Sequence, residues 1–305
     1  MDWKSRRITT LLEAALLEDK VANDITTALT IDPALRATGT IVAKQPCIVA
    51  GLGCVSAFLS LYGKMKPSHT SARFEVVSHP EIFDGVHVRK GQALAVLRAN
   101  AASILATERV ILNLMQRMSG IATLTNEYVR AVAPANSKAK SKTKIATKIL
   151  DTRKTIPGLR ALDKYAVCCG GGVNHRLDLQ DGILIKNNHI SLGGGLPAVL
   201  ARALEGRKPG QIVQVEVRSA LELNQAIAGQ ADSILLDNMT PKEVKKAVAL
   251  IRKGLPKATI EASGNMNLKT VAAYAKTGVD FISVGALTHS ATAVDLSMRI
   301  TAATY

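Results

Sequence analysis

The feature that most restricts the fold is a series of short apolar runs between residues 145 and 287, most of them separated by helical patterns. Strand, helix and strand recur at intervals of about 20 to 30 residues, which predicts a parallel sheet with crossover helices. The even spacing, and the lack of a G-x-G-x-x-G fingerprint after the first strand, favour a closed α/β barrel over an open doubly wound sheet. The expected strands cover 145–150, 182–186, 212–217, 233–237, 258–263 and 280–287, and the expected helices 196–206, 219–229, 240–254 and 267–278.

Residues 1 to about 118 carry a different pattern. Ile8, Leu11, Leu12, Ala15 and Leu16 follow helical spacing and predict an amphipathic opening helix. Alternating apolar and polar positions with glycine punctuation predict half-exposed antiparallel strands, whereas apolar residues spaced by three and four predict a long helix that Gly120 divides in two. These strands are expected within 39–51 and 72–99, and the long helix over 102–132.

Composition excludes several classes of protein. No uninterrupted apolar stretch of about 18 residues occurs, so we expect no membrane span. Acidic residues appear before any apolar core develops at the N-terminus, so a signal peptide is not indicated. Cys47, Cys54, Cys168 and Cys169 form no C-x-x-C pair, which favours reduced thiols in a cytosolic protein. A zinc site built from Cys168, Cys169 and His175 is the alternative.

Part of the net charge of +15 comes from one lysine-rich segment, and the rest is spread along the chain. Residues 137–148 hold five lysines and no acid, a composition typical of a solvated, low-complexity loop. A nucleic-acid-binding protein would also be basic. However, an aromatic content of only 3% leaves few stacking platforms, and no helix-turn-helix or zinc-finger pattern is present, so we expect no nucleic-acid partner.

Nearly every strand expected after residue 145 ends in a charged residue, a hydroxyl or a glycine. Parallel strands place their carboxyl ends on one face of a barrel, where active sites form, so these residues should meet at one mouth. The strand-end residues are Asp151, Arg153, Lys154, Lys186, Glu216, Asp237, Ser263, Gly264, Asn265 and Gly285.

This mouth would be rich in cations. Arg153, Lys154 and Lys186 are joined by His175 and Arg176 from the glycine-rich segment CGGGVNHR. Clustered cations repel one another unless a polyanion lies among them, and arginine favours bidentate binding of carboxylate or phosphate. The glycine-containing ends of the last two strands suit backbone binding of a phosphate, and the two carboxylates suit Mg²⁺ or sugar hydroxyls. The residues therefore predict a phosphorylated sugar and a carboxylated partner as ligands.

Several segments closely resemble the family of nicotinate-nucleotide pyrophosphorylase (carboxylating), also called quinolinate phosphoribosyltransferase. The similarity runs in order over almost the whole chain, and its most specific part combines DTRKT, GGGVNHR and IKNNH. The chain departs from the usual family pattern at Asn187, where an acidic residue is common, and at Asn23, where glycine is common. The similar segments are LLEDKVANDIT, ERVILNLMQRMSGIAT, DTRKTIPGLRALDKYAVCCGGGVNHR, ILIKNNH, VEV, LLDNM, EASGN and SVGALTHS.

The resemblance implies an N-terminal α/β sandwich domain over 1–118, with the tail 286–305 returning to it, and an incomplete α/β barrel over 119–285. It also implies a homodimer, with any further assembly left open, and the cysteine pattern leads us to expect this dimer in the cytoplasm. One subunit's N-terminal domain would cover its partner's barrel mouth, and Arg109 would reach the partner's site. Without the resemblance, Arg109 would be interpreted as a helix-surface residue.

By resemblance, the substrates are quinolinate and phosphoribosyl pyrophosphate with Mg²⁺. The products are nicotinate mononucleotide, pyrophosphate and carbon dioxide, in NAD biosynthesis, with no organic cofactor. Catalytic roles fall to Lys154, Lys186, Glu216 and Asp237, the last two also engaging the metal. The expected substrate-binding set is Arg109, Thr152, Arg153, His175, Arg176, Lys186, Glu216, Asp237, Ser263, Gly264, Asn265, Ser283, Gly285 and His289.

Three alternatives remain beside this interpretation. A paralogue of the molybdenum-transport-associated type would use another acceptor, although Arg109 and Arg176 favour a dicarboxylate. Lys186 at a strand end could instead form a Schiff base, as in barrel aldolases. His189 could orient Lys186 or simply satisfy the loop, and we favour the loop.

Overall fold

The computed structural model describes residues 1–66, 74–137 and 146–303. They form two compact units. The first comprises Met1–Leu124, Ile156–Gly171 and Ala291–Tyr305, and the second Thr125–Thr155 and Gly172–Ser290. The domain limits expected from the sequence, 1–118 and 119–285, stay a prediction.

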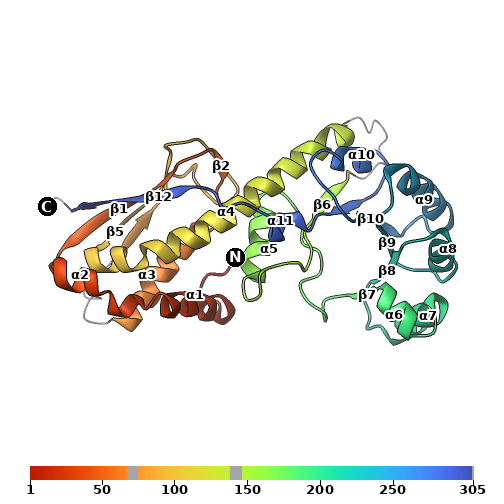
Figure 1. Ribbon diagram of the computed structural model, residues 1–305, viewed down its shortest axis with the longest axis horizontal. Coiled ribbons are helices and arrows are strands. Elements are labelled where there is room, and N and C mark those ends of the chain that lie inside the picture. The colour runs from red at the N-terminus through yellow and green to blue at the C-terminus, as the bar shows by residue number, and fades with distance from the viewer. Residues whose placement is uncertain (67–73, 138–145, 304–305) are drawn as a thin grey trace. The chain divides into compact units, whose positions relative to one another are not determined.

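The first unit contains a four-stranded antiparallel sheet in the order β12-β1-β5-β3, of which β12, β1 and β5 are labelled in Figure 1. Along β1, buried positions alternate with half-buried ones, as expected for strands with one face on a core. The tail strand β12 pairs with β1 from Ala37 opposite Ala302 to Ala43 opposite Leu296, which confirms that the C-terminal tail returns to the N-terminal part of the chain. The four strands are β1 Arg36–Ala43, β3 Glu75–Val77, β5 Ala93–Asn100 and β12 Leu296–Ala302, and a separate two-stranded sheet joins β2 Cys47–Ile48 to β4 His87–Val88.

Helices pack with this sheet in the first unit. The predicted opening helix is confirmed as α1, which buries Ile8, Leu12 and Leu16 at helical spacing. Asp24 caps the short helix α2 by accepting a hydrogen bond of 3.0 Å from the backbone N–H of Thr27. The helices are α1 Arg6–Glu18, the 3₁₀ turn η1 Val21–Asn23, α2 Ile25–Thr30, α3 Gly53–Met65, α5 Arg160–Cys169 and the first part of α4 Ala101–Ser137.

The long helix α4 runs without interruption through Gly120, so the expected division at this glycine is wrong. The glycine serves close packing instead. A Cβ at position 120 would lie 2.2 Å from the carbonyl oxygen of Thr292. Only a residue without a side chain therefore allows the tail backbone to approach the helix this closely.

We expect Gly120→Ala to lower the free energy of unfolding by about 1–3 kcal/mol, the usual cost of overpacking. The nearest atoms are backbone, which cannot rotate out of the way. Chemical denaturation of both proteins would measure this difference. Gly206→Ala is the matched control, because nothing lies within 4 Å of a Cβ at position 206, near the end of a helix. If both variants had wild-type stability, the packing role of Gly120 would be wrong.

The second unit contains the predicted parallel sheet, with six strands in the order β6-β11-β10-β9-β8-β7. All six strands lie within the ranges expected from the sequence. The edge strands β6 and β7 do not pair with each other in the described part of the chain. The barrel is therefore incomplete, as the resemblance implies, and not closed as the strand spacing suggested. The strands are β6 Lys148–Leu150, β7 Ile183–Ile185, β8 Val213–Val217, β9 Ser233–Asp237, β10 Thr259–Ser263 and β11 Phe281–Ser283.

Crossover helices follow the strands, as the sequence predicted. Thr240 and Glu243 form a capping box at the start of α9, where Pro241 occupies the first helical turn, so local sequence sets this boundary. Along α9, Val244, Ala247, Val248 and Ile251 form its buried stripe. The helices are α6 Asn187–Leu192, α7 Leu196–Gly206, α8 Ala220–Ala228, α9 Pro241–Gly254, α10 Val271–Ala275 and α11 Ala286–His289.

The structure also bears on the predictions for the lysine-rich segment, the cysteines, a zinc site and a membrane span. Most of the lysine-rich segment, 138–145, lies outside the described residues, while Lys148 already belongs to β6. All four cysteines are free thiols, and burial raises the pKa of Cys47 to about 11. Among the described residues, no three His, Cys, Asp or Glu side chains are grouped so as to hold a metal, which leaves the zinc alternative without support. No described helix is long and apolar enough to span a membrane.

Candidate active site

A cavity of about 890 Å³ opens at the carboxyl ends of the parallel strands, entirely within the second unit. It brings together every predicted site residue except Arg109, from segments that span 138 positions of sequence. Its lining therefore agrees with the expected convergence at one mouth. The predicted residues that line it are Thr152, Arg153, Lys154, His175, Arg176, Lys186, Glu216, Asp237, Ser263, Gly264, Asn265, Ser283, Gly285 and His289.

Arg109 is the predicted site residue that the cavity lacks. It lies on the part of α4 that belongs to the first unit, and its side chain is exposed. An exposed position on this helix agrees with either expectation for it, a surface residue or one that reaches a partner subunit. Its role in a partner's site stays a prediction.

The cation-rich segment after β6 is anchored by a carboxylate that does not line the cavity. Asp151 is fully buried and accepts a 2.8 Å hydrogen bond from the backbone N–H of His175. Val173 also pairs with this strand through a parallel bridge to Leu150. Asp151 thus holds the glycine-rich segment beside β6, and this position places His175 at the mouth.

Two arginines lie close together in the cavity. The pKa of Arg176 is lowered from its ordinary value, first by burial and then by the positive charge of Arg153. The Nη1 of Arg176 donates to the carbonyl of Gly182 over 3.0 Å. The Nε of Arg153 is buried and has no hydrogen-bond partner in the described part of the chain. A buried, unpaired guanidinium nitrogen beside a second cation is costly unless an anion binds there.

Lys186, the residue after β7, faces Glu216 on the neighbouring strand β8. The Nζ of Lys186 lies 3.5 Å from the Oε2 of Glu216. Lys186 is also the N-cap of α6, and its backbone N–H donates to the Nδ1 of His189 over 2.9 Å. His189 therefore satisfies a backbone N–H of the loop, and this N–H belongs to Lys186 itself. The contact agrees with both roles considered from the sequence.

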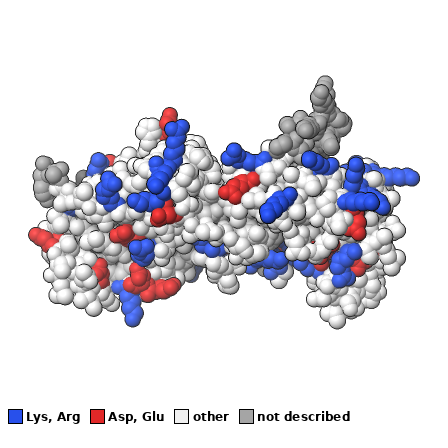
Figure 2. Space-filling model, turned by 45° about the horizontal axis from the view of Figure 1, so that its top comes forward, with Lys and Arg blue, Asp and Glu red and all other residues white. Residues whose placement is uncertain are grey.

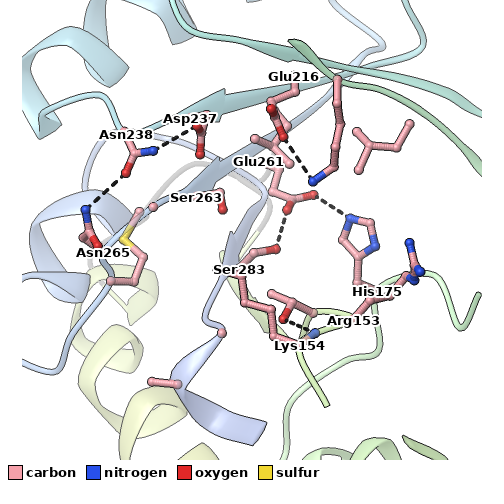
Figure 3. Close-up of a pocket in the computed structure, with 18 of the residues that line it drawn as sticks. Arg153, Lys154, His175, Glu216, Asp237, Asn238, Glu261, Ser263, Asn265 and Ser283 are labelled. Atoms are coloured by element: carbon pink, nitrogen blue, oxygen red, sulfur yellow. Dashed lines mark hydrogen bonds and ion pairs between the residues drawn. The ribbon is translucent and has the colours of Figure 1, made fainter. Parts of the chain in front are cut away.

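At the ends of β9 and β10 a network of amides surrounds Asp237. The Nδ2 of Asn238 donates to Asp237 over 2.9 Å, while its Oδ1 accepts from Asn265 over 3.3 Å (Figure 3). Gly264 has a φ of +102°, and a Cβ there would lie 2.2 Å from the Oδ1 of Asn238. The glycine is thus required by both its backbone conformation and its close contact with Asn238.

Lys154, Gly285 and His289 form the side of the cavity next to β6 and β11. The hydroxyl of Thr288 donates to the carbonyl of Lys154 over 2.8 Å and fixes the backbone there. A Cβ at Gly285 would lie 3.1 Å from the His289 ring and 3.2 Å from the Lys154 side chain. A bare backbone therefore adjoins two basic side chains, an arrangement suited to a phosphate or pyrophosphate group.

Two polar residues of the cavity were missed from the sequence, Asn238 and Glu261. Glu261 is only 2% exposed and adds a third carboxylate to the mouth, where two were expected. It lies two residues before Ser263 on β10, so both side chains point to the same face of the strand. This alternation would have identified Glu261. The remaining unpredicted lining residues are Leu184, Leu235, Met266 and Ala286.

The carboxylates allow a test of whether the site suits Mg²⁺. Glu216 and Asp237 both line the cavity, but no third His, Cys, Asp or Glu joins them in a metal-binding group among the described residues. Mg²⁺ commonly binds one or two carboxylates together with water and substrate phosphates. The donor set therefore fits a magnesium ion that arrives with a phosphorylated substrate, rather than one held by protein alone.

The basic side chains do not form a continuous patch on the face shown in Figure 2, where acidic side chains lie among them. In the cavity, by contrast, Arg153, Lys154, Arg176 and Lys186 line one space with three carboxylates. The parallel sheet and this cavity define an α/β-barrel protein whose mouth is suited to small anionic ligands.

Comparison with known proteins identifies the family. The chain belongs to the quinolinate phosphoribosyl transferase family, whose C-terminal domain matches residues 121–299 and whose N-terminal domain matches 24–119. It is 39% identical over 290 residues to the nicotinate-nucleotide pyrophosphorylase [carboxylating] of Mycobacterium leprae, covering 95% of each chain. It is 38% identical over 291 residues to a probable enzyme of that name from Bacillus subtilis, covering 95% of this chain and 92% of the relative.

Solved structures support the same assignment. NadC from Streptococcus pyogenes matches with a TM-score of 0.86 and 32% identity, covering 100% of both chains. The nicotinate-nucleotide pyrophosphorylase of Francisella tularensis matches with a TM-score of 0.80 and 36% identity, covering 96% of this chain and 97% of that one. The expected family and fold class are confirmed.

Proposed function

We propose that this chain is a decarboxylating quinolinate phosphoribosyltransferase. It would convert quinolinate and phosphoribosyl pyrophosphate into nicotinate mononucleotide, pyrophosphate and carbon dioxide, in NAD biosynthesis. The observation that carries the proposal is the joint presence of the Arg153–Arg176 pair and the Glu216–Asp237 carboxylates in one cavity. The full-length relatives named for this activity support it.

The acceptor, quinolinate, carries two carboxylates on a pyridine ring. Arg153, His175, Arg176 and Lys186 would hold them, and the buried Nε of Arg153 would obtain its missing hydrogen-bond partner. This binding would aim the ring nitrogen at the anomeric carbon of the sugar. Positioning of two bound reactants is a major catalytic device when they must meet in line.

Phosphoribosyl pyrophosphate would occupy the rest of the cavity. Lys154 and His289 would neutralise the pyrophosphate, with Thr152 and Ser283 among the contacts. Ser263, Gly264, Asn265 and Gly285 would bind the 5′-phosphate. Glu216 and Asp237 would engage the ribose hydroxyls and the Mg²⁺ that accompanies this substrate.

Bond breaking at the anomeric carbon puts positive charge on the ribose ring, and the Glu216 and Asp237 carboxylates would stabilise it. After transfer, the neighbouring carboxylate would leave as carbon dioxide, and the electron pair of the broken bond would stay on the ring carbon. The positive charge of the adjacent pyridinium nitrogen would stabilise this pair until the carbon takes up a proton. The alkylated substrate is thus its own electron sink, and no organic cofactor is needed for this step.

One assay tests the proposal directly. The protein would be incubated with quinolinate, phosphoribosyl pyrophosphate and Mg²⁺, and nicotinate mononucleotide, pyrophosphate and carbon dioxide would be measured. We expect the three products in equal amounts. A parallel reaction without Mg²⁺ tests the metal requirement. Absence of nicotinate mononucleotide under these conditions would rule the proposal out.

We also propose a cytoplasmic homodimer in which Arg109 enters the partner's site. Free thiols at all four cysteines support a reducing compartment, and the exposed position of Arg109 on α4 supports its role across the interface.

If Arg109 acts in the partner's site, two inactive variants should complement each other. Arg109→Ala and Arg153→Ala proteins would be unfolded, mixed in equal amounts and refolded. About half of the dimers would then be mixed, each with one intact site of two, which predicts about a quarter of wild-type activity. Each variant refolded alone is the control. Mass spectrometry would show whether mixed dimers form. If they form and the mixture stays inactive, Arg109 does not act across the interface.

A further inference from the structure

The buried carboxylate of Glu261 joins three parts of the barrel at the cavity floor. Its Oε2 accepts a 2.7 Å hydrogen bond from the Nε2 of Gln214 on β8, and its Oε1 accepts from the hydroxyl of Ser283 on β11. The Nε2 of His175 lies 3.5 Å from its Oε2 (Figure 3). A glutamate this deeply buried is rare unless its oxygens are paired, and here they are.

The His175 ring is held from both sides. Its Nδ1 accepts a 2.8 Å hydrogen bond from the backbone N–H of Arg176. A neutral imidazole has one donor and one acceptor nitrogen, so the ring proton lies on Nε2, which faces Glu261. Glu261 thereby favours one tautomer of His175, and that tautomer provides the acceptor on which the Arg176 backbone depends.

We propose that Glu261 is a positioning residue for the acceptor, acting through His175 on Arg176. It would set the geometry of the two side chains that bind the quinolinate carboxylates, without itself contacting them. This inference rests on the proposed function for the identity of the acceptor. The contacts that run from Glu261 through His175 to Arg176 are independent of it.

Glu261→Gln is the informative substitution, because it keeps the shape and removes the negative charge. In one orientation the amide N–H₂ would face both the Gln214 amide and the Nε2–H of His175, so a donor would oppose two donors. In the other orientation the N–H₂ would donate to the Ser283 hydroxyl, and a neutral amide oxygen would face His175. Both orientations therefore remove the charged acceptor beside His175.

We expect Glu261→Gln to raise the KM for quinolinate about 10- to 100-fold, the usual effect of losing a hydrogen bond to a charged group. The KM for phosphoribosyl pyrophosphate should change less than about 3-fold, because Glu261 touches the contacts assigned to that substrate through Ser283, one residue of a larger set. Calorimetric titration with quinolinate alone should show the same loss of affinity. A KM for quinolinate equal to that of the wild type would overturn the proposal.

A second measurement does not depend on the reaction. Long-range ¹H–¹⁵N NMR of the histidine rings reports the tautomer, with His175 assigned from a His175→Asn sample. We expect the Nε2–H form in the wild type and a shifted His175 ¹⁵Nε2 resonance in Glu261→Gln, because the charged acceptor beside Nε2 is lost in either amide orientation. An unchanged Nε2 resonance would overturn the proposal even if the protein proved to act on another acceptor. Failure of the quinolinate assay alone would concern the function.

Asp280→Asn separates positioning from general loss of stability. Asp280 is a buried carboxylate of the same unit, paired with Arg252 and with the backbone N–H of Ile260 at the opposite ends of the strands from the cavity. This variant should be destabilised, yet it should keep both KM values and the His175 tautomer below its melting temperature. If it raised the KM for quinolinate as Glu261→Gln does, the effect would be structural and the proposal wrong.

Discussion

Replacement of Arg153 by alanine should lower kcat/KM for quinolinate by about 10²- to 10⁴-fold, because two charge-assisted hydrogen bonds are worth roughly 3–6 kcal/mol together. Its guanidinium lines the cavity, and its Nε is buried without a partner among the described residues. A planar guanidinium with an unpaired donor nitrogen suits a planar acceptor such as a carboxylate. Steady-state kinetics with each substrate varied in turn would measure the loss.

The same substitution should leave the melting temperature unchanged or raise it. Arg153 lowers the pKa of Arg176, which means that the two cations repel each other in the folded protein. Removal of one cation relieves this repulsion, so stability and activity should change in opposite directions.

Two further variants complete this test. Arg153→Lys keeps the positive charge but loses the planar guanidinium that can bind a carboxylate through two hydrogen bonds. This variant should retain only part of the activity. Arg218→Ala removes an exposed arginine that pairs with Glu222 outside the cavity, and should have wild-type kinetics. Near-normal turnover in Arg153→Ala would refute the assigned role.

Glu216→Gln should lower kcat about 10²- to 10³-fold, the range seen when one preorganised electrostatic contact to a transition state is lost. Glu216 lines the cavity at the end of β8, 3.5 Å from the Lys186 ammonium. The amide keeps the size of the side chain but removes the charge that would stabilise the ribose as pyrophosphate leaves. Because this charge develops only during the reaction, the KM for quinolinate should change little.

The control for this variant lies six residues further along the chain. Glu222 also carries an ion pair, with Arg218 at 3.0 Å, but it belongs to α8 and does not line the cavity. Glu222→Gln should therefore retain wild-type kcat. A kcat for Glu216→Gln within a few-fold of the wild type would show that its charge does not act in the rate-limiting step.

The sequence by itself determined the parallel sheet and the place of the site. Apolar runs bounded by glycine and helical patterns located all six barrel strands, because hydrophobic periodicity is a local property of the chain. Charged or glycine-containing strand ends identified the mouth, since parallel strands must end on one face. The capping box at Thr240 and the helical spacing of Leu12 and Leu16 likewise depend on residues close together in the sequence.

Only the tertiary structure decided which side chains meet. The use of Gly120 for close packing on Thr292 depends on a contact between residues 172 positions apart, so the same glycine looked like a helix break in the sequence. Asp151 proved to bind the backbone N–H of His175, and Glu261 proved to be a buried residue of the cavity. Pairing of buried polar groups is a property of three-dimensional surroundings, because its energy depends on which donors and acceptors remain after water is excluded.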